Sequence, residues 1–183
     1  MLRMTSVAAL VLTLAASTAF AGQAPRKDLQ ILNDISSQVN RYTRFTVFDD
    51  VNASVDAGEV TLTGKVTMPY KRNDIERRVG KVDGVTTVNN QITVLPVSHF
   101  DEELRFKIAR AIYGNSTFWN YASMANPPIH IVVDHGRVTL TGVVNSNVER
   151  VLARSLATSF GAFSIANELK TDAEVKAAIE NIP

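Results

Sequence analysis

The stretch VTLTG at residues 60–64 recurs at residues 138–142, 78 residues further along the chain. The pattern V-D-x-G-x-V runs into both copies from the upstream side, and a valine follows each copy two residues later. So many identities at a single offset indicate an internal duplication of one supersecondary unit. The chain is therefore predicted to contain two copies of one small fold.

Two pairs of glycines follow from the repeat. Gly58 and Gly136 lie in D-x-G segments between apolar runs, where a hairpin turn needs a residue that tolerates positive φ. Gly64 and Gly142 end the repeated pentapeptide. We expect each pair to occupy the same structural position.

Residues 1–21 have the pattern of a secretory signal peptide. Arg3 supplies the positive charge, residues 7–14 are apolar, and Ala-Phe-Ala at 19–21 fits the cleavage motif. An N-terminal membrane anchor is the alternative, but the apolar run is short for a bilayer span. We expect cleavage, a periplasmic location, and a short N-terminal segment at residues 22–27.

Composition narrows the function further. The chain has 183 residues, of which 45% are hydrophobic and 20% charged, as in ordinary globular proteins. It has no cysteine, so neither disulfides nor a lipid-attachment cysteine can contribute. Once Arg3 leaves with the signal, 18 basic and 18 acidic residues remain, which argues against a nucleic-acid-binding protein.

The first copy, residues 28–96, shows the order helix, strand, strand, helix, strand. Asp28 is a candidate N-cap for a helix whose apolar residues recur every three or four positions. Alternating apolar residues at 51–55 and 60–66 predict two strands of a hairpin. Pro69 can open the second helix, and alternation returns in the last strand.

The second copy, residues 100–171, repeats this order, with Asp101 as the candidate N-cap of its first helix. The fold class is therefore α+β, with two tandem αββαβ modules, each a small three-stranded mixed sheet covered by two helices.

The linker at 97–99 is short, so the modules should contact each other. Residues 172–183 are predicted to form a short amphipathic C-terminal helix that docks on the second module, because Thr171 and Glu174 make a capping box.

The repeated unit resembles the BON domain. The features that carry the resemblance are V-x-L-x-G after a D-x-G turn, then a helix, then G-V-x-x-V-x-N. The first copy reads GVTTVNN at 84–90, whereas the second departs from the pattern with GAFSIAN at 161–167. BON domains are shared by osmotically induced periplasmic proteins. The resemblance implies a non-enzymatic envelope protein that binds phospholipid or envelope surfaces and supports membrane integrity under osmotic or envelope stress.

Metal and catalytic sites are not expected. The three histidines, His99, His130 and His135, include no pair at helical i, i+4 spacing, and no cysteine accompanies them. The sequence contains no nucleophile elbow, P-loop or G-x-G-x-x-G motif. We therefore predict no catalytic residues, no metal, no cofactor and no enzymatic activity.

The second copy has a longer connection between its first helix and first strand, and this connection contains Phe118, Trp119 and Tyr121. Aromatic residues with a polar tip suit a membrane–water interface. Lys107 and Arg110 on the preceding helix could meet phosphates. These five residues are the predicted contact with an anionic phospholipid membrane. The alternative is that the rings complete the second core or the contact between modules.

A basic run lies on the second helix of the first copy: Lys71, Arg72, Arg77, Arg78 and Lys81. It is read either as a solvated helix face with i, i+4 ion pairs or as a surface that faces lipid headgroups.

Asn90 and Asn167 share strand parity with apolar neighbours, at an offset of 77 because one residue is lost before this strand. We predict that they are structural equivalents, point toward the core and form hydrogen bonds there.

These patterns favour an exported protein that binds envelope lipid. The alternative is a periplasmic adaptor that binds an envelope protein and makes no direct contact with lipid.

Overall fold

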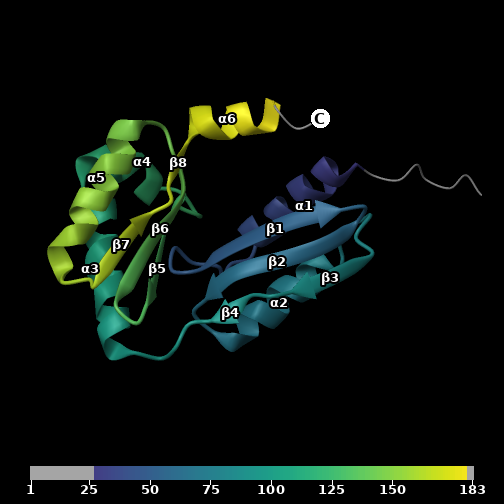
Figure 1. Cartoon of the computed structure of the whole chain (residues 1–183), viewed down its shortest axis with the longest axis horizontal. Coiled ribbons are helices and arrows are strands. Elements are labelled where there is room, and N and C mark those ends of the chain that lie inside the picture. Colours follow the sequence, from purple (N-terminus) through teal and green to yellow (C-terminus); the bar gives the residue numbers. More distant parts are fainter. Residues whose placement is uncertain (1–26, 181–183) are drawn as a thin grey trace, which may run out of the picture.

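The computed structural model describes residues 27–180, which form two αββαβ modules (Figure 1). The predicted α+β fold with two tandem units and a C-terminal helix is confirmed. The first module contains α1 (Asp28–Asn40), β1 (Asp50–Asp56), β2 (Glu59–Val66), α2 (Pro69–Val79), β3 (Thr87–Asn90) and β4 (Thr93–Val94). The second contains α3 (His99–Tyr113), η1 (Ser116–Phe118), α4 (Trp119–Ala122), β5 (Ile129–Asp134), β6 (Arg137–Val144), α5 (Asn147–Ala157), η2 (Thr158–Phe160), β7 (Ser164–Asn167), β8 (Lys170–Thr171) and α6 (Asp172–Glu180).

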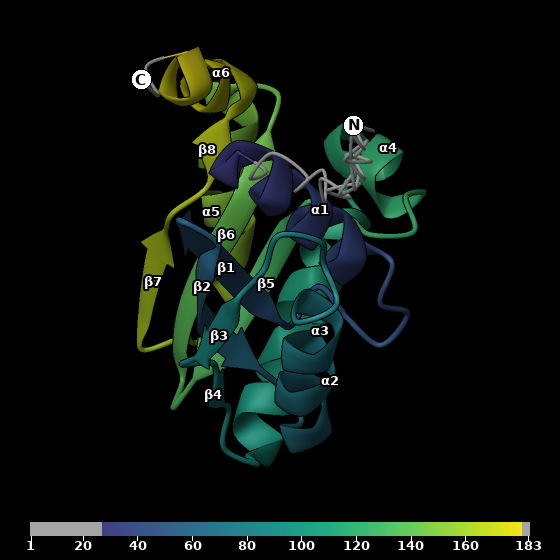
Figure 2. The same cartoon turned by 90° about the vertical axis from the view of Figure 1, so that its right-hand side faces the viewer.

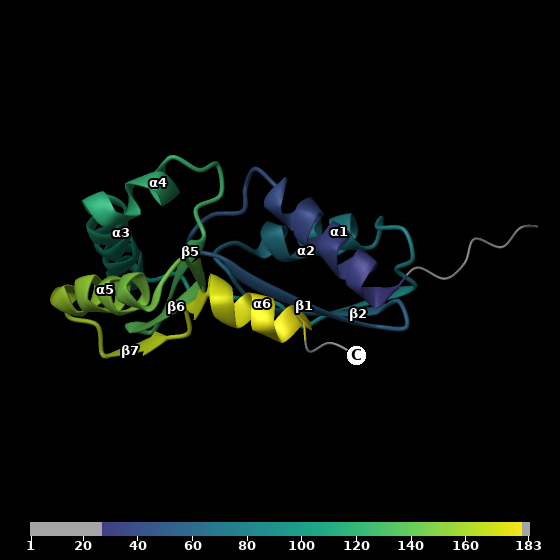
Figure 3. The same ribbon diagram turned by 90° about the horizontal axis from the view of Figure 1, so that it is seen from above.

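Each module is a mixed sheet built around its second strand. β2 pairs antiparallel with β1 and parallel with β3 and β4, and β6 pairs in the same way with β5, β7 and β8. The short strands β4 and β8 bring each predicted three-stranded sheet to four. Two helices cover one face of each sheet; Figure 3 shows α1 and α2 on the same side of the first. Residues of one parity on β2 and β6 are buried beneath these helices, as the alternation predicts.

The repeated glycines occupy equivalent positions. Gly64 lies opposite Val51 in the register of the first hairpin, and Gly142 lies opposite Ile129 in the second. Their φ angles are +118° and +110°, which side chains with a Cβ rarely adopt. A Cβ at either position would also overlap the backbone carbonyl oxygen that precedes its register partner. Glycine is therefore required at both places.

Asp28 does not cap its own helix. Its carboxylate accepts hydrogen bonds from the backbone N–H groups of Ala57 (2.9 Å) and Gly58 (3.1 Å) at the tip of the first hairpin. The N-cap of α1 is Lys27, which makes no side-chain cap bond. Successive N–H groups in a left-handed turn form a concavity that binds anions, and this explains why the carboxylate points there.

Asp101 has the same role in the second module. It accepts from the backbone N–H groups of His135 (2.9 Å) and Gly136 (2.7 Å), while the hydroxyl of Ser98 caps α3 by accepting from Asp101 N. The prediction that these two aspartates are N-caps is therefore wrong. They fasten the first helix of each module to its hairpin.

Asn90 and Asn167 are structural equivalents. The Asn90 side-chain amide donates to the carbonyl oxygen of Arg72 (3.2 Å), and that of Asn167 donates to the carbonyl oxygen of Arg150 (2.9 Å). Both side chains are half-buried rather than enclosed in the core. They tie the last strand of each module to the first turn of its second helix, and only Asn90 also accepts a hydrogen bond from the adjacent backbone, at Ile92 N (3.1 Å).

The C-terminal helix α6 begins with the predicted capping box, in which Thr171 N donates to Glu174 (2.7 Å) and Glu174 N donates to the Thr171 hydroxyl (3.3 Å). The helix contacts β6 and β8 of the second module. Figures 1 and 2 show it projecting beyond the end of β8. No helix within residues 27–180 is long and apolar enough to cross a membrane. The predicted signal peptide lies outside these residues.

The modules contact each other, as the short linker predicts. The segment before β1 lies along the free edge of β5, where Ile131 N donates to the carbonyl oxygen of Val47 (2.6 Å). The His130 Nδ1 atom lies 2.6 Å from the carbonyl oxygen of Asp49. An open strand edge invites pairing with other chains. Here the neighbouring module covers it.

Two side-chain contacts also join the modules. Lys65 forms an ion pair with Asp134 at 2.5 Å, and the Thr141 hydroxyl donates to Asp50 at 3.0 Å. The hydrogen bond from Lys65 lowers the pKa of Asp134. These contacts set the orientation of one sheet relative to the other.

A buried ion pair supports the segment that crosses the interface. Asp49 has no exposed surface, and it accepts hydrogen bonds from the backbone and hydroxyl groups of Thr46 and Thr67. Lys71, also buried, donates to Asp49 at 2.6 Å. Burial alone would raise the pKa of Asp49, but these hydrogen bonds outweigh it, and the pKa lies below its usual value. Lys71 is thus not part of a solvated basic face, contrary to the prediction.

The first prediction concerns the strand glycines. Gly142→Ala should destabilise the protein by about 2–4 kcal/mol, because positive φ and overlap with a carbonyl add together. Gly80→Ala is the matched control, since Gly80 has right-handed helical backbone and room for a Cβ, and it should change stability by about 1 kcal/mol or less. Urea unfolding measures both, and equal losses would contradict the assignment.

The second prediction concerns the buried ion pair. Lys71→Met should lower the free energy of unfolding by about 3–5 kcal/mol, because it leaves the Asp49 carboxylate buried without its cation. The double variant Asp49→Asn, Lys71→Met should recover part of this loss, because no charge remains buried. Denaturant unfolding at neutral pH checks both, and a double variant as unstable as the sum of the single variants would argue against a charge effect.

The third prediction concerns the two asparagines. Asn90→Ala and Asn167→Ala should each cost about 1 kcal/mol, the lower end for a lost side-chain hydrogen bond, because water can reach a half-buried site. Thermal unfolding of the two variants should give similar shifts. If neither variant changes the unfolding midpoint, the strand-to-helix bond contributes nothing to stability.

Candidate functional site

The outward face of α3 combines apolar and basic side chains around one shallow pocket. Phe106 is 55% exposed, and Lys107 and Arg110 follow it on the same face. The pocket has a volume of about 510 Å³ and is lined by Glu103, Phe106, Lys107, Arg110, Ala111 and Phe160. The pocket therefore combines the apolar side chains of Phe106, Ala111 and Phe160 with two cations, Lys107 and Arg110.

Electrostatics leave this face with a small positive excess. Glu103 and Lys107 form an exposed i, i+4 ion pair at 2.8 Å, and the bond from Lys107 lowers the pKa of Glu103. Arg110 lies in the last turn of α3, and its exposed side chain has no hydrogen-bond or ion-pair partner among residues 27–180. The guanidinium is thus free to meet an anionic ligand.

Two of the predicted membrane-contacting rings are buried. Phe118 is 0% exposed and Tyr121 is 6% exposed, and their stacked rings lie 6.0 Å apart within the second core. The Tyr121 hydroxyl donates to Glu149 at 2.7 Å and accepts from the backbone N–H of Asn145 at 3.0 Å. The surface role predicted for these rings is wrong, because the longer connection folds into η1 and α4 and turns both rings inward. The alternative, that the rings complete the second core, is correct for these two.

The chemistry of Tyr121 agrees with an anchoring role. Burial, together with the hydrogen bond to Glu149, raises the pKa of Tyr121 to about 12. The hydroxyl therefore keeps its proton at neutral pH and continues to donate to the carboxylate.

Trp119 has the opposite environment. It is the first residue of α4 and is 73% exposed. Helix α4 packs against α3, but Trp119 does not line the pocket beside Lys107 and Arg110. The structure thus brings Lys107 and Arg110 together and places Trp119 on the neighbouring helix.

Sequence reasoning missed Phe106 and Phe160 as residues that line the pocket. The apolar stripe of α3 runs through Leu104, Ile108 and Ile112, so a phenylalanine at 106 lies off that stripe, and this signal was available. Phe160 ends η2 just before Gly161, where no periodicity distinguishes it.

Two arginines of the basic run on α2 have local partners. Arg77 forms an ion pair with Asp74 at 2.6 Å, and the Arg78 guanidinium lies 4.7 Å from the centre of the Tyr42 ring. Tyr42 in turn donates to Asp74 at 2.7 Å. This arrangement matches the interpretation of a solvated helix face with internal pairs.

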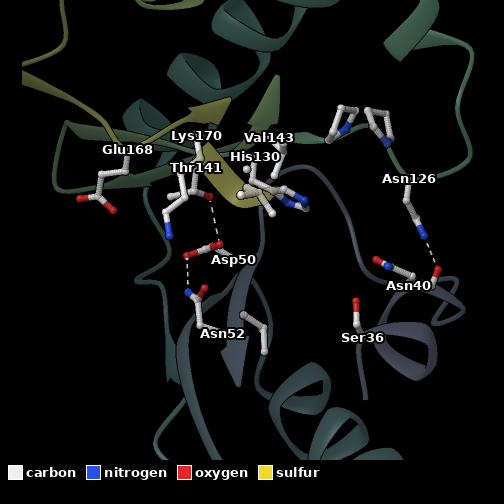
Figure 4. Close-up of a pocket in the computed structure, with 15 residues that line it drawn as sticks. Ser36, Asn40, Asp50, Asn52, Asn126, His130, Thr141, Val143, Glu168 and Lys170 are labelled. Carbon is white, nitrogen blue, oxygen red and sulfur yellow. Dashed lines mark hydrogen bonds between the residues drawn. The ribbon is translucent and has the colours of Figure 1, made fainter. Parts of the chain in front are cut away.

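A second cavity lies between the modules, with a volume of about 780 Å³ (Figure 4). Its charged lining residues are two carboxylates, Asp50 and Glu168, against one cation, Lys170. Asp50 is held by Asn52 and Thr141. With more negative than positive charge, this cleft does not suit an anionic headgroup. Within residues 27–180 no cluster of three or more potential metal ligands occurs.

The two modules also match a known family in sequence. The model of the BON domain matches residues 27–96 and again residues 101–173. The chain belongs to the BON domain family. Its two BON domains coincide with the two structural modules, and the candidate pocket lies on the first helix of the second.

Comparison of this BON-domain chain with solved structures gives distant similarities. One is CdsD, described as a structural protein of the type III secretion system of Chlamydia trachomatis, at 12% identity and a TM-score of 0.28, covering 84% of this chain and 99% of that one. The C-terminal domain of CdsD also matches at 12% identity and a TM-score of 0.28, covering 79% of this chain and 98% of that one. No curated protein matches the chain in sequence.

Proposed function

We propose that this BON-domain protein is a non-enzymatic, periplasmic envelope protein that binds anionic phospholipid through the outward face of α3. The observation that carries the proposal is the shallow apolar pocket flanked by Lys107 and Arg110. The rings of Phe106 and Phe160 supply apolar surface, and the two cations supply charge.

Both kinds of surface are needed for a stable membrane contact. A few apolar side chains alone bind weakly and reversibly, and each basic residue near an anionic surface adds only about 1 kcal/mol. On α3 the exposed Phe106 ring can enter the boundary between headgroups and acyl chains while Lys107 and Arg110 stay at the level of the phosphates. Trp119, exposed on the adjacent helix, suits the same interfacial depth.

The position of this face supports the same function. It lies on the helical side of the second module, whereas the first module covers the edge of the second sheet. A surface bound there leaves the fold and the contact between modules unchanged. In the envelope, such attachment would support membrane integrity under osmotic or envelope stress, as the family resemblance implies.

The test is binding of the mature protein to vesicles of phosphatidylglycerol mixed with phosphatidylcholine. Lys107→Gln, Arg110→Gln should weaken binding by about one order of magnitude, because two cations are lost and one of them is already paired with Glu103. Raising the salt concentration should weaken wild-type binding. Trp119 is the only tryptophan, so its emission should shift to shorter wavelength as vesicles bind.

Arg77→Gln, Lys81→Gln is the matched control, since it removes the same charge from exposed positions on α2 and in the turn after it. It should bind nearly as wild type. If both double variants lose affinity equally, only net charge matters and the α3 site is wrong. If wild type binds no vesicles, an adaptor that recognises an envelope protein becomes the better proposal.

A further inference from the structure

The exposed phenylalanine of the pocket rests on a residue of the other module. The rings of Phe106 on α3 and Phe48 in the first module meet edge to face, with centroids 5.2 Å apart and an angle of 80° between the planes. Phe48 belongs to the segment between α1 and β1, and it packs against the core of the second module. One wall of the pocket is therefore supported from the first module.

The support is rigid, because both neighbours of Phe48 are fixed. The carbonyl oxygen of Val47 accepts a hydrogen bond from β5 at 2.6 Å. The carboxylate of Asp49 is buried and paired with Lys71. The backbone carbonyl oxygen of Asp49 lies 2.6 Å from His130 Nδ1. A residue held on both sides in this way has little freedom to change the direction of its side chain.

We propose that Phe48 is a positioning residue of the lipid-binding surface, so that the surface on α3 is completed by the first module. The proposal rests on the function proposed above. Phe48 does not line the pocket, but its ring holds the Phe106 ring in one orientation while half of Phe106 stays open to solvent.

Preorganisation is the physical reason that this contact affects binding. An unsupported, exposed phenylalanine samples several rotamers, and a ligand that uses it must order it first. The edge-to-face contact removes that ordering step before the membrane arrives. The first module thereby contributes to affinity without touching lipid.

The experiment measures vesicle affinity of the full mature chain for Phe48→Ala, Phe106→Ala and the double variant. Phe48→Ala should weaken binding by about threefold to tenfold, the range expected for losing an aromatic pair and a preordered side chain. In the Phe106→Ala background the same substitution should have no further effect. Phe48→Tyr keeps the ring and should restore wild-type affinity. Urea unfolding of each variant ensures that binding is compared where every protein is fully folded.

Phe45→Ala is the matched control. Phe45 belongs to the same segment and contacts the second module through His130, with ring centroids 5.4 Å apart, but it does not touch Phe106. It should lower stability and leave vesicle affinity unchanged. Wild-type affinity in Phe48→Ala, or equal losses in Phe48→Ala and Phe45→Ala, would overturn the positioning role. Multiplied losses in the double variant would overturn it too. Failure of the wild-type protein to bind vesicles would instead refute the proposed function itself.

Discussion

The carboxylate of Asp49 is the constraint on which the arrangement of the two modules depends. A charge with no exposed surface is tolerated only if it is paired and its lone pairs accept hydrogen bonds. Lys71, Thr46 and Thr67 satisfy it, and they come from α2 and from the connections on either side of the first hairpin. Because all of these groups must converge, the segment before β1 has one conformation.

That conformation decides how the second module docks. With the segment fixed, the carbonyl oxygens of Val47 and Asp49 face β5, and Phe48 reaches α3. The first module covers the edge of the second sheet, so other strands cannot pair with it. The cleft between the modules is lined by the carboxylates of Asp50 and Glu168. The cationic, apolar face of α3 begins at Phe106, the residue that Phe48 contacts. The backbone contacts between the modules therefore lie on β5, whereas α3 carries the proposed membrane surface and meets the first module through the Phe106 ring.

The two modules share the residues that fix their backbone conformation but differ in the side chains at one corner of the sheet. The strand glycines, the aspartate that holds each hairpin and the asparagine that reaches the second helix occur in both modules. By contrast, Glu149 stands at the repeat position of Lys71, so the charge at this corner is reversed. Tyr121 donates to that carboxylate, and the longer connection that supplies this tyrosine also exposes Trp119. The second module therefore differs from the first at this corner and has the only tryptophan of the chain.

Sequence alone determined the repeated unit, its element order, the strand parity and the equivalence of the repeated glycines. These follow from local periodicity and backbone sterics, which the chain carries in its own residues. The positions predicted for Lys71, Phe118 and Tyr121 were wrong. Periodicity in the sequence shows which residues lie off the apolar face of their own element, but not whether another part of the chain covers them. The roles of Asp28 and Asp101 were missed for a related reason, since their partners lie 29 or more residues away. Only the tertiary structure could place Phe48 against Phe106, because that contact depends on how the segment around Asp49 is fixed in the first module and docks on β5 of the second.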